Sequence, residues 1–388
     1  MADAGLMPWP ITIGLRYRHK DAWVGGIYYV RNLVRGLGLL PPGRRPRLVM
    51  IGGDAEGLED LRSATDYTDL RRISRARLTL APPRRWRPPF SAGPEEIDMV
   101  LMGSSPGLEA RGVQWVPDFQ EHRFPQYFPP EELAARRRRN EEWFSRHRHV
   151  MVSSRDVAED LERYYGRLGA RAHVARFASF TEADMEGVDL GDLRRRYGLP
   201  DRYFICNNQF WRHKNHGLVL RALAEVEGDL PPVVFTGLEE DYRDPAYGPS
   251  VRGLAHALGV AHRTIFLGFL PRGDQLGLMA GAVAVLQPSL CEGWSTVIED
   301  AKAVGRHVLA SDIAVHREQL QSGVHFFPPE DPAALAGLLR RLGEQDPPPR
   351  NEDYAFARRR FADDLSVLIA EVHDDLRRSR APRILISD

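Results

Sequence analysis

The sequence has few cysteines and no long apolar run. Cys206 and Cys291 are the only cysteines among 388 residues, which argues against a disulfide framework. Both lie in apolar segments, where buried thiols are expected. No run of about 18 consecutive apolar residues is present, so no bilayer-spanning helix is expected. The first ten residues, MADAGLMPWP, lack the basic start and apolar centre of a secretion signal. We therefore expect a cytoplasmic protein.

The sequence also lacks an excess of either charge. It carries 53 Lys and Arg against 53 Asp and Glu. The distribution is uneven, because residues 1–178 hold 29 basic and 22 acidic side chains, which leaves 24 and 31 for the remainder. A basic first half favours an anionic partner such as a phosphate or a lipid surface, although a solvated arginine-rich surface is the simpler interpretation.

Two basic clusters raise the question of nucleic-acid binding. They are PRRWRPP at 83–89 and RRRRN at 136–140. The second cluster falls in a helical pattern with glutamates nearby, which is typical of a solvated, salt-bridged face. We therefore expect no nucleic-acid partner. Peripheral contact with an anionic membrane stays an alternative.

Short apolar runs alternate with amphipathic stretches along the chain. Runs such as ITIGLRY (11–17) and AVAVLQ (282–287) are typical of buried strands, and the stretches between them follow a helical period. Continuous apolar strands alternating with helices indicate parallel sheets covered on both faces. We predict an α/β protein with two doubly wound, Rossmann-like domains at residues 1–180 and 181–359. The last helix, about 360–388, is expected to pack back on the first domain.

One stretch, SLCEGWSTVIEDAK, combines two carboxylates with a strand-to-helix junction. Glu292 and Gly293 follow the carboxyl end of a predicted strand, where open parallel sheets bind ligands. The backbone amides that open the next helix suit a phosphate, because they are unpaired and lie at the positive end of the helix dipole. Glu292 and Glu299 instead suit the hydroxyls of sugars. Without a ligand, Thr296 and Glu299 would form a capping box, and Glu292 would complement the dipole.

These residues resemble the signature of the retaining glycosyltransferases of family 4, the group 1 transferases. The family pattern is E-G-F-G-x-x-x-x-E with a later G-x-P-V-x-x-S-D. Upstream, NQFWRHKNH resembles the phosphate-binding region of a subgroup, and the likeness is nearly continuous over about 190–330. The resemblance implies a GT-B fold, in which two Rossmann-like domains face a central cleft. The first would bind the acceptor and the second the nucleotide-sugar donor.

The resemblance also implies roles for the two glutamates and the junction between them. Glu299 matches the carboxylate that holds the nucleotide ribose, and Glu292 matches the one that contacts the donor sugar. The amides expected to meet the distal phosphate are those of Gly293, Trp294, Ser295 and Thr296.

Charge at the leaving diphosphate is expected from Lys214. The family's partner arginine is replaced by Gln209, and Arg212 is the candidate that would supply the missing charge. The nucleobase usually lies against the turn after the FLGF strand, which makes Phe269 and Leu270 candidates. Both fit a core role equally well.

The first half is expected to contribute from the other side of the cleft. Gly25 and Gly26 match a glycine pair that lets the backbone approach phosphate and sugar, although an ordinary turn also explains them. VPDFQEHRF resembles a segment that faces the reacting sugar, so Asp118 and His122 are candidates for catalysis. The family's histidine position holds Glu121 here, and surface or turn roles stay open.

The sequence has no D-x-D motif and no Cys/His cluster with zinc-ligand spacing, so no metal site is expected. The resemblance implies a retaining, front-face transfer without metal or other cofactor. The co-substrate would be a UDP, GDP, ADP or dTDP sugar, and the acceptor a hydroxyl of a glycan, a lipid-linked sugar or a natural product. The alternatives are a sugar-phosphate enzyme of the same fold and a catalytically silent protein that binds sugar nucleotides.

Overall fold

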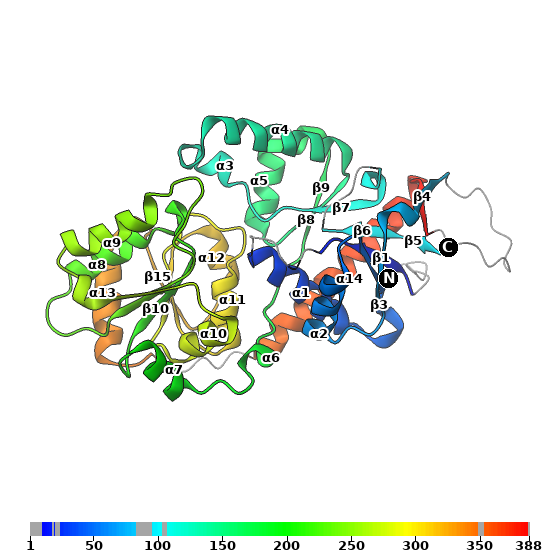
Figure 1. The fold of residues 1–388 in the computed structure, drawn as a ribbon. Helices are drawn as coiled ribbons and strands as arrows, with labels where there is room; N and C mark the ends of the chain where they lie inside the picture. Colours follow the sequence, from blue (N-terminus) through cyan, green and yellow to red (C-terminus); the bar gives the residue numbers. More distant parts are fainter. Residues whose placement is uncertain are drawn as a thin grey trace. The chain divides into compact units, whose positions relative to one another are not determined.

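The computed structural model describes residues 10–17, 19, 24–82, 95–102, 107–347 and 353–386. The basic segment 83–89 therefore lies outside the described residues. The chain divides into two compact units, each with its own parallel sheet (Figure 1). Unit 1 comprises Met1–Phe119, Ala135–Ala178 and Ala355–Asp388, and unit 2 comprises Gln120–Ala134 and Ser179–Tyr354. The α/β class and the two Rossmann-like sheets predicted from the alternating pattern are confirmed.

The sheet of unit 1 has the strand order β3-β2-β1-β6-β7-β8-β9, and all of its pairs are parallel. Most of these strands are buried apolar runs, as the sequence predicts. The two edge strands differ: β9 buries only His173, and β3 was missed because its central residues Arg71 and Arg72 are exposed. The strands are β1 Thr12–Leu15, β2 Arg47–Ile51, β3 Leu70–Ile73, β6 Met99–Leu101, β7 Gly112–Trp115, β8 His149–Val152 and β9 Arg171–Val174.

The end of the chain packs within unit 1. Helix α14 crosses α1 at Gly36, where an added Cβ would lie 2.9 Å from the ring of Phe361, so only glycine allows this approach. Strand β16 pairs antiparallel with β4 and β5 in a separate small sheet. The bounds are α1 Val24–Gly38, α2 Ala55–Thr65, α4 Pro130–Arg146, α5 Arg155–Tyr165, α14 Tyr354–Arg378, β4 Leu78–Ala81, β5 Glu96–Ile97 and β16 Arg383–Ile386.

The sheet of unit 2 is also parallel and has the order β12-β11-β10-β13-β14-β15. From β10 the chain moves outward to β11 and β12, and then returns to place β13 on the other side of β10. The strand order therefore reverses between β10 and β13, which is where open α/β sheets bind ligands. The strands are β10 Phe204–Asn207, β11 Val233–Thr236, β12 Thr264–Gly268, β13 Val285–Gln287, β14 Val308–Ser311 and β15 Val324–Phe327.

Apolar clusters cover both faces of this sheet. Successive residues of β10 alternate between them, because side chains along a strand point to opposite faces. Phe204 joins the cluster beneath α8, α9 and α13, and Ile205 joins the cluster beneath α7, α10 and α11. The helices are α3 Gln120–Arg123, α6 Glu182–Met185, α7 Leu190–Tyr197, α8 His216–Ala224, α9 Tyr247–Ala257, α10 Arg272–Gly281, α11 Thr296–Ala303, α12 Ala314–Gln319 and α13 Pro332–Glu344.

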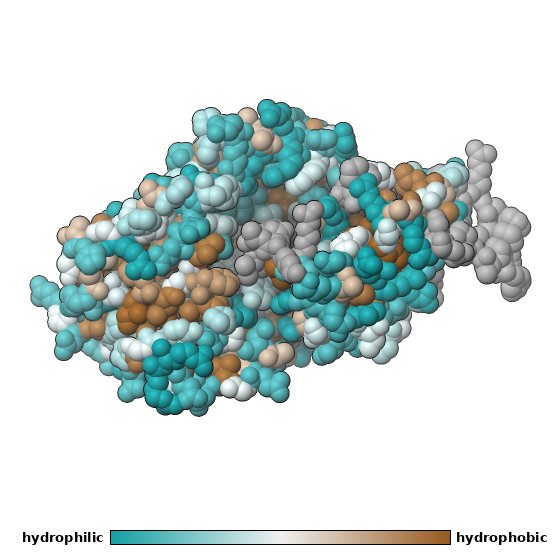
Figure 2. All heavy atoms as spheres, in the orientation of Figure 1, coloured by the Kyte–Doolittle hydropathy of each residue, from teal (hydrophilic) through white to brown (hydrophobic). Residues whose placement is uncertain are grey.

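The surface is mostly hydrophilic in the face drawn in Figure 2, with apolar residues gathered on the part formed by unit 2. Edge strand β12 is partly exposed along its whole length. Among the described residues, no helix combines the length and apolarity needed to cross a bilayer. Cys206 and Cys291 are both buried thiols, as predicted.

Candidate active site in unit 2

Two loops meet at the reversal of strand order in unit 2. β10 and β13 are parallel neighbours, so their carboxyl ends lie at the same edge of the sheet. Lys214 ends the 3-10 turn Arg212–Lys214 that follows β10, and Glu292 lies in the loop after β13. The amide of Leu290 donates a hydrogen bond of 2.7 Å to the carbonyl oxygen of His213, which joins the two loops.

Lys214 and Glu292 form the ion pair at the centre of this site. Lys214 Nζ lies 2.6 Å from Glu292 Oε1, and the two side chains are only 14% and 9% exposed. Burial alone would raise the pKa of Glu292, but the Lys214 ammonium, the His316 imidazole and hydrogen bonds outweigh burial and lower it. The predicted phosphate lysine and sugar carboxylate are therefore together, and the carboxylate is ionised at neutral pH.

The buried amide side chains of Gln287 and Asn208 position Glu292. Gln287 Nε2 donates to Glu292 Oε1 at 2.7 Å and to Ser289 Oγ at 3.0 Å. Gln287 Oε1 in turn accepts from Asn208 Nδ2 at 3.1 Å. Gln287 and Asn208 were not among the predicted site residues. The signal was present, because Gln287 is a polar residue that ends the otherwise apolar run AVAVLQ.

His316 lies beside this network, and one of its ring nitrogens is an unused hydrogen-bond acceptor. Its Nδ1 lies 2.9 Å from the carbonyl oxygen of Ser311. A carbonyl only accepts, so Nδ1 carries the proton and Nε2 is an acceptor. Nε2 is buried and has no hydrogen-bond partner among the described residues. Burial, partly opposed by Glu292, lowers the pKa of His316 to about 4, which keeps the ring neutral. His316 was also missed from the sequence.

The junction before α11 is arranged differently from the prediction. Ser295 is the N-cap, and its Oγ accepts from the Ile298 amide at 3.3 Å. The capping box considered for Thr296 and Glu299 is therefore wrong, because Ser295 is the cap and the residue three positions later is Ile298. The Ser295 amide donates to Gln319 Oε1 at 3.1 Å, so this predicted phosphate donor already has an acceptor.

Glu299 is 1% exposed and receives three hydrogen bonds. Oε1 accepts from Lys302 Nζ at 3.0 Å and from Gln319 Nε2 at 2.9 Å. Oε2 accepts from the Tyr354 hydroxyl at 2.6 Å. Burial, reinforced by the Glu299 charge, raises the pKa of Tyr354 well above its usual value, so this hydroxyl remains a donor. A carboxylate has about four acceptor positions, which leaves one on Oε2, while the ribose contact of Glu299 stays a prediction.

Glu299→Ala is expected to lower the free energy of unfolding by about 3–5 kcal/mol, because the buried Lys302 ammonium loses its carboxylate. Urea unfolding of the variant measures this loss. Glu225, which is exposed, provides the control substitution Glu225→Ala. If both variants unfold at the same urea concentration, the network around Glu299 does not stabilise the fold. Lower activity in Glu299→Ala alone would not demonstrate contact with a ribose.

Other predicted residues of unit 2 lie in different surroundings. Arg212 Nε donates to Asp244 Oδ2 at 2.5 Å, so the charge expected to compensate for Gln209 is paired with a carboxylate. Leu270 is 7% exposed and belongs to the core beneath α10, which agrees with the alternative of a core role. Phe269 is 58% exposed after β12, which leaves its ring accessible.

The residues predicted from the first half fall in both units. Gly25 and Gly26 lie in the first turn of α1 in unit 1. Asp118 follows β7, also in unit 1, whereas His122 belongs to the short helix α3 of unit 2. Asp118 and His122 are both half-buried. Their proposed roles stay predictions.

The residues at the centre of the site lie in a region that matches a known protein family. Residues 192–359 match the family model described as glycosyl transferases group 1, which identifies a domain of this type in the second half of the chain. Both Lys214 and Glu292 lie inside the matched region. No curated protein matches the chain as a whole or in part.

Solved structures with the same fold cover nearly the whole chain. HepE from Anabaena, in complex with UDP, is 13% identical with a TM-score of 0.59, over 95% of this chain and 99% of that one. A glycosyltransferase from Rickettsia africae is 15% identical with a TM-score of 0.60, over 95% and 97%. Sucrose-phosphate synthase from Thermosynechococcus elongatus is 15% identical with a TM-score of 0.59, over 95% and 98%. The shared fold is the GT-B fold.

Proposed function

We propose that this protein is a glycosyltransferase that moves a sugar from a nucleotide-diphosphate sugar to an acceptor hydroxyl. The observation that carries the proposal is the Lys214–Glu292 pair, 2.6 Å apart where the strand order of unit 2 reverses, inside the region that matches the group 1 family. A lysine beside a carboxylate at such an edge suits a ligand that joins a phosphate to a sugar.

The ion pair gives each partner a role when the donor binds. A diphosphate carries more negative charge than one carboxylate, so it competes for the Lys214 ammonium. Glu292 is then free to accept hydrogen bonds from sugar hydroxyls, while Gln287 keeps its carboxylate in place. His316 Nε2 supplies another acceptor for a hydroxyl group nearby. Unit 2 is therefore the donor unit in this proposal, and unit 1 contributes Gly25 and Gly26 near the phosphate and sugar and Asp118 near the reacting sugar.

Departure of the diphosphate is the step that the site favours. As the bond from the sugar carbon to the phosphate oxygen breaks, negative charge grows on that oxygen, and Lys214 stabilises it. Amides at the start of α11 add to this stabilisation, and such preorganised groups are usually the largest single source of catalysis. We propose that the acceptor hydroxyl attacks from the same side and passes its proton to the leaving phosphate. This retains the anomeric configuration and uses no metal.

Two observations favour a second candidate, a protein that binds sugar nucleotides without turning them over. Gln209 stands where the family has an arginine, and the Ser295 amide is committed to Gln319. Both reduce the positive charge available to a leaving diphosphate. Under this candidate, nucleotides bind but no nucleoside diphosphate is released from any sugar nucleotide.

A thermal-shift panel of UDP, GDP, ADP and dTDP, followed by their sugars, tests the proposal. The structures of HepE contain UDP, UDP with glucose, or UDP-glucose, so uridine nucleotides are the first to try. A nucleotide at about 100 times its Kd stabilises the fold by about 2.7 kcal/mol, which corresponds to a rise of about 2–4 °C. The matching nucleoside without phosphates should give no shift at the same concentration.

Release of the nucleoside diphosphate then separates the two candidates. The transferase proposal expects slow hydrolysis of one sugar nucleotide by water and faster release with an acceptor present. A panel in which nothing shifts the melting temperature would contradict both candidates.

A further inference from the structure

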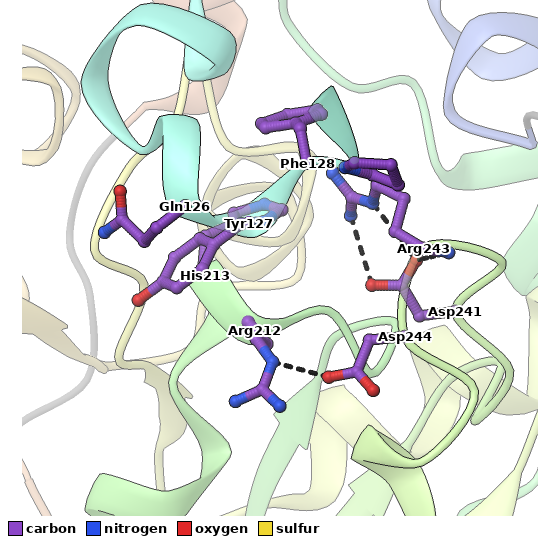
Figure 3. Close-up of a pocket in the computed structure, with 9 residues that line it drawn as sticks. Gln126, Tyr127, Phe128, Arg212, His213, Asp241, Arg243 and Asp244 are labelled. Atoms are coloured by element: carbon purple, nitrogen blue, oxygen red, sulfur yellow. Dashed lines mark hydrogen bonds and ion pairs between the residues drawn. The ribbon is translucent and has the colours of Figure 1, made fainter. Parts of the chain in front are cut away.

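A pocket lies beside the turn that carries Lys214, because Arg212 and His213 of that turn line it. It is an open pocket of about 300 Å³ within unit 2 (Figure 3). One wall comes from the segment before α4 and the other from the loops after β10 and β11. The lining residues are Gln126, Tyr127, Phe128, Pro129, Arg212, His213, Asp241, Arg243 and Asp244.

The back of the pocket is a fixed wall. Arg243 pairs with Asp241 at 3.1 Å, and the two side chains are only 6% and 2% exposed. The guanidinium of Arg243 also lies over the rings of Phe128 and Trp211, at 5.1 Å and 4.9 Å from their centres. These contacts compensate the charge of Arg243 within the protein. This arginine therefore forms part of the pocket wall and has little capacity to bind a ligand.

The mouth of the pocket offers a donor and an acceptor side by side. Arg212 and Asp244 pair through Nε and Oδ2, and their side chains are 50% and 22% exposed. Figure 3 shows that the contact with Asp244 is made by Nε and by neither terminal nitrogen of Arg212. Among the described residues, Asp244 is the only acceptor for Arg212, and it uses one carboxylate oxygen. The terminal N–H groups and the second carboxylate oxygen are therefore open to a ligand.

The charges in the pocket cancel. Arg212 and Arg243 are matched by Asp241 and Asp244, while burial keeps the pKa of His213 well below its usual value, so that ring is neutral. A pocket without net positive charge does not favour a phosphate. Tyr127, stacked on Phe124 with ring centres 5.4 Å apart, adds an aromatic edge and a hydroxyl. Paired donors and acceptors beside an aromatic ring match a neutral ring bearing neighbouring hydroxyls.

We propose that this pocket binds a neutral saccharide unit of the acceptor. The inference rests on the proposed function, and it assigns Arg212 to the acceptor instead of the diphosphate. Arg212 and His213 line the pocket and Lys214 is the next residue, so one short turn separates the sugar from the lysine that meets the leaving group. The volume is at the small end of ligand sites, which suits one or two sugar rings.

Asp244→Asn tests the site, because it removes the charged acceptor and releases Arg212. The probes are the methyl glycosides of glucose, galactose, mannose and N-acetylglucosamine, titrated into the full chain and followed by ligand-observed NMR. At least one should bind, and its Kd should rise by about tenfold or more in Asp244→Asn, as expected when a charged hydrogen bond is lost. Arg212→Gln should give a similar rise.

The matched control is Asp312→Asn in the pair formed by Asp312 and Arg317. This pair is also exposed, belongs to unit 2 and has its arginine over an aromatic ring, that of Phe326 at 4.8 Å. The control should bind the glycoside as the unmodified protein does. Equal weakening in both variants would overturn the proposal, and so would a glycoside Kd unchanged by Asp244→Asn and Arg212→Gln.

The nucleotides separate failure of this inference from failure of the proposed function. In Asp244→Asn, the Kd of the nucleotide that stabilises the protein should stay within about twofold of its value in the unmodified protein. This corresponds to a change in binding free energy of less than about 0.5 kcal/mol. A loss of nucleotide affinity would place the nucleotide in this pocket and overturn the saccharide assignment. No glycoside binding in a protein that binds nucleotide would overturn it as well. Absence of nucleotide binding would instead contradict the proposed function.

Discussion

Replacing Lys214 with methionine is expected to lower kcat for release of the nucleoside diphosphate by about 10²–10³-fold, the usual effect of removing one group that stabilises a developing negative charge. The variant keeps an unbranched side chain only one atom shorter but loses the ammonium that lies 2.6 Å from Glu292. The assay uses the sugar nucleotide identified by thermal shift, at saturating concentration, so that kcat and KM are obtained separately.

A double variant separates catalysis from folding. Lys214→Met leaves Glu292 charged, buried and unpaired, and breaking such a pair costs about 3–5 kcal/mol. Lys214→Met combined with Glu292→Gln removes both charges, so its urea midpoint should recover towards that of the unmodified protein. Its kcat should stay low. If the double variant turned over at the normal rate, Lys214 would have no part in the reaction.

Acidification from pH 6.5 to pH 4 is expected to destabilise unit 2 strongly. Burial lowers the pKa of His316 to about 4 and that of His216 to about 3. In the unfolded chain both imidazoles take up a proton near pH 6.5, whereas in the folded chain they stay neutral, so the unfolded state binds more protons. The free energy of unfolding therefore falls as the pH falls. For His316 alone, the loss is about 3 kcal/mol.

Urea midpoints at pH 6.5, 5.5 and 4 measure this loss. Substituting His316 with glutamine removes one titrating group, so the decline of the midpoint between pH 6.5 and pH 4 should be shallower. His262 is exposed and provides the control, His262→Gln. An identical pH profile in His316→Gln and the unmodified protein would show that His316 is already protonated when folded, or that the site is not buried in solution.

Much of the architecture could be predicted because it depends on local patterns. Apolar runs of four or five residues indicate strands buried on both faces, and the amphipathic stretches between them gave the helices. The same patterns placed Glu292 after the end of a strand, whereas Lys214 came from the family resemblance, and the adjacency of β10 and β13 brings the two together. The edge strand β3 was missed because exposure of Arg71 and Arg72 breaks the apolar pattern.

The partners of the site residues could not be predicted, because side chains distant in sequence provide them. Glu299 was assigned to a cap or to a ribose, whereas Tyr354, 55 residues later, occupies one of its oxygens. Ser295 and Gln319 exchange hydrogen bonds between two helices that no periodicity relates. The segment Gln120–Ala134 likewise belongs to unit 2 through contacts, although its sequence lies among the strands of the first half.

The contact between Ser179 and Tyr354 brings the two ends of the longer segment of unit 2 close together. The Ser179 amide donates to the Tyr354 hydroxyl at 2.7 Å, so the two ends of the long segment Ser179–Tyr354 are separated by little more than the length of one tyrosine side chain. A segment with adjoining ends behaves as an insert, which can be cut out or circularly permuted without stretching its backbone. Only the short stretch Gln120–Ala134 would have to be supplied separately, as a peptide that completes the pocket.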